Sequence, residues 1–144
     1  MPAGRLQSCT LPAVGQLPYR QLIVWQKANS LAGQILDIAE EPPFARRFYF
    51  RDQICDAAMS VPANIAEGNG RSTPLDYASF LDRSRGSLFE LDSWMFMAAR
   101  REMISRETHE HLEAQIQEIS AMLLAMANRL RNTPRLQSRR INGK

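Results

Sequence analysis

Apolar residues recur along most of the chain at steps of three and four, which is the spacing of one face of an α-helix. The first such segment covers residues 21–40 and ends at Pro42-Pro43, because the residue before a proline avoids the helical region. The second covers residues 48–67. No stretch alternates convincingly with the two-residue period of a β-strand. The pattern therefore predicts an all-α protein.

Two further helices have start signals that can be read locally. Thr73 suits the N-cap of the third, Pro74 its first helical position and Asp76 its first turn. The fourth follows Ser105 as N-cap and carries an apolar seam at alternating steps of four and three. That seam consists of Leu112, Ile116, Ile119, Leu123, Met126 and Leu130. Four helices with short connections predict an up-down-up-down antiparallel four-helix bundle.

The second helix has a proline inside its periodic run. Pro62 removes one backbone donor and crowds the carbonyl four residues earlier, which costs about 3 kcal/mol in an isolated helix. We predict a helix kinked at Pro62 and held by its neighbours. Asn64 and Glu67 are predicted to satisfy backbone groups left unpaired there, although a ligand-gripping polar cluster with Arg71 is an alternative. Gly68 is expected to cap the helix in the left-handed conformation.

Large aromatic side chains surround the third helix on several sides. A helix in a monomeric bundle buries one face, so either loops or another subunit must cover the remaining rings. We expect contacts between subunits to be anchored by Trp25, Phe80 and Trp94. The pattern thus favours self-association.

Charge divides the chain unevenly. The formal net charge is +3, but residues 129–144 hold six basic and no acidic residues, whereas residues 1–128 hold the other 12 basic and all 15 acidic ones. We expect a flexible N-terminal arm over residues 1–20, the bundle over residues 21–131 and a basic flexible tail over residues 132–144. The candidate nucleic-acid contacts are Arg129, Arg131, Arg135, Arg139, Arg140 and Lys144.

No set of residues assembles a catalytic or metal site. His109 and Glu113 share a helix face, but a zinc hydrolase of the HExxH type needs histidine at the last of its five positions, where this chain has Glu113. A solvated surface pair is the better interpretation. Cys55 lies on the helical seam and is expected to be a small core residue rather than a nucleophile. We therefore predict that the protein is not an enzyme and needs no cofactor or metal.

Targeting signals are also lacking. No apolar run approaches the ~18 residues that cross a bilayer, and no signal peptide is evident. The two cysteines do not make a disulfide framework. We expect a soluble, cytoplasmic protein with no membrane partner.

Four segments carry a resemblance to a known family. They are Val24-Trp25-Gln26-Lys27-Ala28, Asp52-Gln53-Ile54, Ser60 through Gly68 with Gly70-Arg71, and Gly86-Ser87-Leu88-Phe89-Glu90-Leu91. Over roughly residues 22–128, their order and spacing resemble the four-helix-bundle proteins encoded by intervening sequences of bacterial 23S ribosomal RNA genes. The chain departs from that family in having Arg101-Glu102 where a member commonly has Leu-Gly.

The resemblance implies a four-helix bundle, closed rings of five subunits and no established enzymatic activity. Related bundles serve as accessory proteins of diversity-generating reverse transcriptases and are thought to bind the enzyme and its RNA through basic ring surfaces, whereas the body of this chain is acidic. Two hypotheses follow. The first is a ring-forming scaffold or accessory protein in a nucleic-acid process, with a protein partner; the second is an RNA-binding module that uses the basic tail.

Overall fold

The computed structural model describes the backbone of residues 17–141 and the side chains of residues 17–133. Its elements are the 3-10 helix η1 Pro18–Gln21 and the α-helices α1 Ile23–Ala39, α2 Pro42–Ala45, α3 Phe48–Asn69, α4 Pro74–Arg100 and α5 Arg106–Ile141. No strand occurs among these residues, so the predicted all-α class is confirmed. Within the same part of the chain, no helix combines the length and the apolar character needed to cross a membrane.

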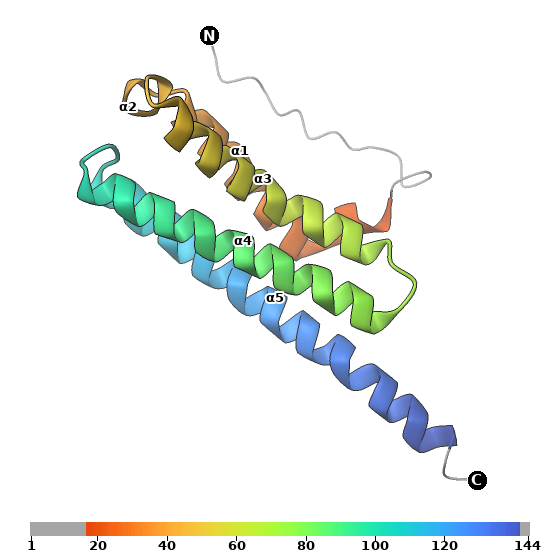
Figure 1. Cartoon of the computed structure of the whole chain (residues 1–144). Helices are drawn as coiled ribbons and strands as arrows, with labels where there is room; N and C mark the ends of the chain where they lie inside the picture. The colour runs from red at the N-terminus through yellow and green to blue at the C-terminus, as the bar shows by residue number, and fades with distance from the viewer. Residues whose placement is uncertain (1–16, 142–144) are drawn as a thin grey trace.

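The four long helices form an antiparallel bundle (Figure 1). Each lies against the next along the chain, and α5 returns to α1, while diagonally opposite helices do not approach each other closely. This is the predicted up-down-up-down arrangement. The α3–α4 side is the most closely packed and the α1–α5 side is the sparsest.

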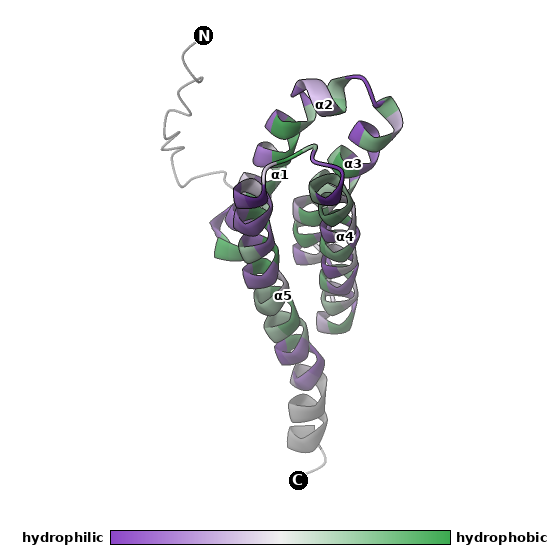
Figure 2. Ribbon diagram, turned by 90° about the vertical axis from the view of Figure 1, so that its left-hand side faces the viewer, coloured by the Kyte–Doolittle hydropathy of each residue, from purple (hydrophilic) through white to green (hydrophobic). Residues whose placement is uncertain are grey.

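The core is built from the apolar stripes that face the bundle axis. Ile35, Ile54, Leu88 and Leu123 are fully buried, one from each long helix. Burying a side chain of this size contributes about 1.5–3 kcal/mol. Hydrophobic and hydrophilic residues accordingly alternate around the helices (Figure 2).

A short helix that the apolar pattern does not predict closes one end of the core. Pro42-Pro43 ends α1 as predicted, but the same prolines also occupy the first positions of α2, which spans the ends of α1 and α3 (Figure 2). Phe44 from α2 is fully buried, and its ring meets Phe50 edge-on at 5.7 Å. The double proline therefore starts one element as well as stopping another.

Both predicted helix starts on the second half of the chain are confirmed. Thr73 Oγ1 accepts a hydrogen bond from the Asp76 backbone N–H at 3.2 Å, with Pro74 in the first position of α4. Ser105 Oγ accepts from the Thr108 N–H at 3.0 Å at the start of α5. Each cap satisfies one of the donors that a helix start leaves without a partner.

The predicted cap at Gly68 is wrong. Gly68 lies inside α3, which ends at Asn69, and the capping residue is Gly70 with φ −81°, outside the left-handed region. A Cβ atom at position 68 would lie 2.7 Å from Phe80 Cβ and 2.9 Å from a ring carbon of Tyr77. Glycine is therefore needed for the close approach of α3 and α4. Pro62 lies within the same continuous helix, and the kink predicted there stays a prediction.

The ends of the bundle differ from the predicted boundaries. Residues 18–20, assigned to the arm, belong to η1, where the Tyr19 ring lies 5.1 Å from that of Trp25. Residues 132–141, assigned to the tail, continue α5 to Ile141. Residues 1–16 and 142–144 lie outside the described residues, so flexibility of arm and tail stays a prediction.

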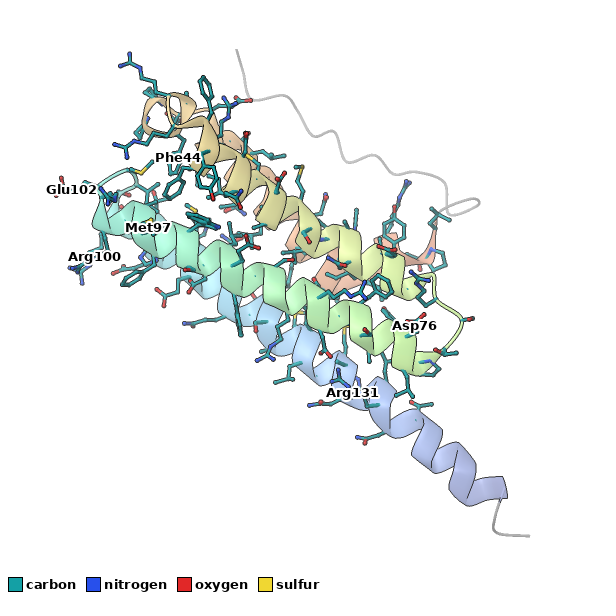
Figure 3. All side chains as sticks on the ribbon, in the orientation of Figure 1. Phe44, Asp76, Met97, Arg100, Glu102 and Arg131 are labelled. Carbon is teal, nitrogen blue, oxygen red and sulfur yellow. The ribbon has the colours of Figure 1, made fainter. Side chains whose placement is uncertain are left out.

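The turn between α4 and α5 contains one residue in the left-handed region. Glu102 has φ 58°, a conformation that costs a residue with a side chain roughly 1–2 kcal/mol and that glycine adopts freely. The Met103 N–H reaches back to the Ala98 carbonyl at 2.9 Å and closes the turn. Figure 3 places Glu102 at the end of the bundle opposite Asp76. The chain thus keeps a turn suited to glycine although it has Glu102 there.

Candidate interaction surfaces

Polar residues on both sides of Pro62 link it to α4, with Asn64 bonded to Ser60 and Ser60 in contact with α4. The Asn64 side-chain amide donates to the backbone carbonyl of Ser60 at 2.8 Å and to its hydroxyl at 2.9 Å. The Ser60 hydroxyl also lies 2.8 Å from that of Ser87 on α4. Asn64 therefore bonds a backbone group, although not the carbonyl that Pro62 leaves without its helical donor.

A buried hydroxyl completes this contact. Ser84 is fully buried and donates to the Val61 carbonyl at 2.8 Å. A serine hydroxyl aimed at the residue before Pro62 ties α4 to the part of α3 that the proline weakens. The segment around Pro62 is therefore chiefly an interhelical contact.

Glu67, Arg71 and Phe80 form a stacked cluster at the α3–α4 turn. Glu67 pairs with Arg71 at 3.2 Å. The guanidinium groups of Arg71 and Arg83 lie 4.5 Å and 4.6 Å from the centre of the Phe80 ring. Phe80 is only 4% exposed, so its own chain covers it. The sequence predicted Phe80 as an anchor of contacts between subunits, but a ring this buried has little surface to offer a second subunit.

The two tryptophans also pack on their own chain. Trp25 is half-buried beside Tyr19. Trp94 is half-buried, with its ring 5.2 Å from Phe50 and 6.3 Å from Tyr49. Each indole therefore keeps only part of its surface available for a contact between subunits.

A different set of apolar side chains points outward from α4. Leu75 is 56% exposed, Phe89 53% and Phe96 57%. They are separated by multiples of seven residues, and each step of seven turns a helix by only ~20°, so all three lie within ~60° of one another. We call these three residues the α4 outer face. The seven-residue spacing was visible in the sequence, but it could not show which of two apolar stripes faces the core.

A second apolar surface is a groove of about 480 Å³ between α1 and α3. It is lined by the small residues Gly33 and Ala63 and by two larger apolar side chains, Leu36, 39% exposed, and Met59, 44% exposed. No atom lies within 4 Å of the position that a Gly33 Cβ would occupy, so the groove is open there. We call this the α1–α3 groove.

The basic residues near the C-terminus are divided. Arg131, labelled in Figure 3, is paired with Asp82 on α4. Arg129 is exposed. The side chains of Arg135, Arg139, Arg140 and Lys144 lie outside the described residues. The backbone of α5 carries the first three of these beyond the end of the other helices (Figure 1).

Cys55 and His109 are the side chains that the sequence offers as a nucleophile and as a metal ligand. Burial raises the pKa of the half-buried Cys55 thiol above its usual value, which disfavours the nucleophilic thiolate. His109 packs edge-on to Phe96, with 5.9 Å between ring centres. In the described part of the chain, no three histidine, cysteine or acidic side chains converge as metal ligands would.

Residues 20–125 match the model of the family described as 23S rRNA-intervening sequence protein. The fold is similar to the crystal structure of a protein of unknown function from the S23 ribosomal protein family of Bacteroides thetaiotaomicron, with a TM-score of 0.68 and 23% identity over 73% of this chain and 98% of that one. At that identity the likeness shows the fold alone. A search of curated proteins finds no match. Since the family match covers well over half of the residues, the chain belongs to the family of 23S rRNA-intervening sequence proteins.

Proposed function

We propose that the protein is a non-enzymatic bundle that associates with its own copies into a ring and serves as a scaffold or accessory protein in a nucleic-acid process. The observation that carries this proposal is the α4 outer face, where Leu75, Phe89 and Phe96 are each more than half exposed. Large apolar side chains aligned on one helix face are typical of a contact surface.

The shape of α4 supports a helix-to-helix contact there. The helix has 27 residues, which gives a face about 40 Å long. Gly86 lies on this face between Leu75 and Phe89, and no atom is within 4 Å of the place its Cβ would occupy. A second helix could therefore approach closely between the large side chains. A ring needs two different surfaces on each subunit, and the α4 outer face would supply one of them.

Charge at the centre of this face should break the assembly. We expect the wild-type protein to sediment as an oligomer, about five times the 16.4-kDa chain if the family resemblance extends to ring size. Phe89→Glu should lower that mass towards the single chain, because assembly would bury the new carboxylate in the contact. Sedimentation velocity and light scattering measure the mass directly.

Phe48→Glu is the matched control, because it makes the same substitution at a side chain that is 62% exposed but belongs to α3. It should leave the assembly mass unchanged. A wild-type protein that sediments as a single chain, or a Phe89→Glu variant with the wild-type mass, would reject the proposed contact. Circular dichroism of both variants shows whether the bundle is still folded.

RNA binding by the C-terminal end of α5 is the second candidate function. It is favoured by the continuation of α5 to Ile141, which holds Arg135, Arg139 and Arg140 on a helix beyond the bundle. The pairing of Arg131 with Asp82 reduces what that residue can contribute. Each phosphate contact lowers the logarithm of the binding constant by about 0.7 per decade of salt for single strands.

Deleting residues 132–144 separates the two functions. If the tail binds RNA, the deletion should weaken binding and flatten its salt dependence by about 0.7 for each lost contact, while the assembly mass stays the same. The triple variant of Arg135, Arg139 and Arg140 to glutamine should reproduce most of the effect. An unchanged salt dependence in both variants would exclude the tail as the RNA contact.

A further inference from the structure

The α1–α3 groove has room for an apolar segment, and the described chain begins beside one end of it. Tyr19 and Trp25 line that end, and Leu17 precedes Tyr19 by two residues. Residues 6–17 contain no charged side chain, so no part of this segment would bring an unpaired charge into the groove. We propose that the α1–α3 groove is the docking site of the N-terminal segment of the same chain, residues 6–16.

The spacing of apolar residues in this segment suits an extended docking conformation. Leu11, Val14 and Leu17 follow each other at steps of three, and Pro12 lies among them. The polyproline II helix has three residues per turn, so this spacing places all three side chains on one edge. Leu17 already has φ −65° and ψ 135°, close to the polyproline II values. The segment can therefore present one apolar edge to the groove.

The length of this edge matches the groove. From Leu11 to Leu17 a polyproline II segment spans about 19 Å. The lining residues of α1 run from Trp25 to Leu36, which is about 17 Å along the helix axis. The docked segment would run antiparallel to α1, with η1 as the connection between them.

The lining of the groove also suits such a ligand. Aromatic side chains commonly line grooves that bind polyproline II segments, and Tyr19 and Trp25 lie at its open end. Asn29 provides a polar side chain for backbone groups that this conformation leaves unbonded. Because the segment is joined to Tyr19, its effective concentration at the groove reaches the millimolar range, which favours the same chain over a second copy.

A photo-crosslinker placed in the segment tests the docking directly. With Val14→p-benzoylphenylalanine in the full-length protein, irradiation should join residue 14 to peptides from residues 29–36 of α1 and 59–66 of α3. Heavy and light protein, unfolded together and refolded as a mixture before irradiation, identify the donor: crosslinks within one chain are all heavy or all light, whereas crosslinks between copies are partly mixed. Crosslinked pairs of mixed isotope would show a second copy in the groove and would overturn the proposal.

Two tryptophan variants supply the matched comparison. Gly33→Trp fills the groove, so the crosslinks from residue 14 should be lost in this variant. Ala114→Trp adds the same side chain at an exposed position on α5 that belongs to neither the groove nor the α4 outer face, and the crosslinks of this variant should be retained. Equal yields from the two variants, or crosslinks scattered over the other helices, would reject the groove as the site. Neither the isotope pattern nor the crosslink yield depends on the mass of the assembly. The test of docking is therefore independent of the proposed self-association.

Discussion

The α3–α4 and α1–α5 sides of the bundle hold their helices together by different means. Between α3 and α4, a glycine lets the helices approach closely, and the buried Ser84 hydroxyl bonds to the opposite backbone. Between α1 and α5, long polar side chains bridge a wider gap. Gln34 and Gln115 exchange hydrogen bonds of 2.8 Å and 2.9 Å, and Lys27 pairs with Glu118 at 2.8 Å.

This difference explains how the chain tolerates Pro62. The proline lies in α3, the helix that α4 grips most closely, so interhelical contacts offset the missing backbone hydrogen bond. No proline interrupts α1 or residues 106–133 of α5, so the α1–α5 side can remain open. Stability should therefore respond strongly to small changes on the first side and weakly to larger changes on the second.

The largest effect is expected from Gly68→Ala. The added Cβ would meet Phe80 Cβ at 2.7 Å, and a Cβ cannot move without its backbone. Overpacking of this kind costs about 2 kcal/mol, more than the gain in helix propensity. Urea unfolding followed by circular dichroism measures the change.

Gly86→Ala is the matched control, because it makes the same substitution in a helix where nothing lies within 4 Å. In the Phe89→Glu background, where the proposed contact between subunits is absent, it should stabilise the bundle by about 0.5–1 kcal/mol through helix propensity alone. Similar free energies of unfolding for the two variants would show that α3 and α4 are not held by a close approach at Gly68.

A smaller loss is expected from Ser84→Ala. The variant removes the hydrogen bond to the Val61 carbonyl beside Pro62, which should cost about 1 kcal/mol. Ser93→Ala changes an exposed serine on the same helix and should stay near the wild-type free energy of unfolding. If the two alanine variants unfold alike, the buried hydroxyl does not support the proline segment.

The features that the sequence predicts depend on residues close to one another in the chain, whereas those that it does not predict depend on contacts between helices. The starts of α4 and α5 were predictable because Thr73 and Ser105 act on donors only three residues away. The role of Gly68 was not, since a glycine near a helix end suits both a cap and a close approach, and only Phe80 opposite it decides between them. For the same reason, the sequence selected Phe80 as an exposed ring, whereas the structure exposes Phe89 and Phe96.

On the α1–α5 side, the glutamine pair should show a compensating effect. Gln115→Leu leaves the half-buried amide of Gln34 without its partner and should cost about 0.5–1 kcal/mol. Adding Gln34→Leu should recover most of that loss, because two apolar groups of similar shape replace the bonded pair. If the double variant loses more free energy of unfolding than the two single variants together, the α1–α5 side depends on polar bridging more than its open packing indicates.

The smallest effect is expected from the ion pair between Lys27 and Glu118, whose side chains are 40% and 55% exposed. A double-mutant cycle with Lys27→Gln and Glu118→Gln should give a coupling energy of about 0.2–1 kcal/mol, because water screens exposed charges and holding two long side chains costs entropy. The coupling should fall further at 1 M salt, where the screening length is about 3 Å. Unfolding of the four proteins at low and high salt measures it. A coupling energy larger than the loss in free energy of unfolding from Ser84→Ala would contradict the comparison of the two sides. An exposed ion pair between α1 and α5 would then stabilise the bundle more than the buried hydrogen bond between α3 and α4.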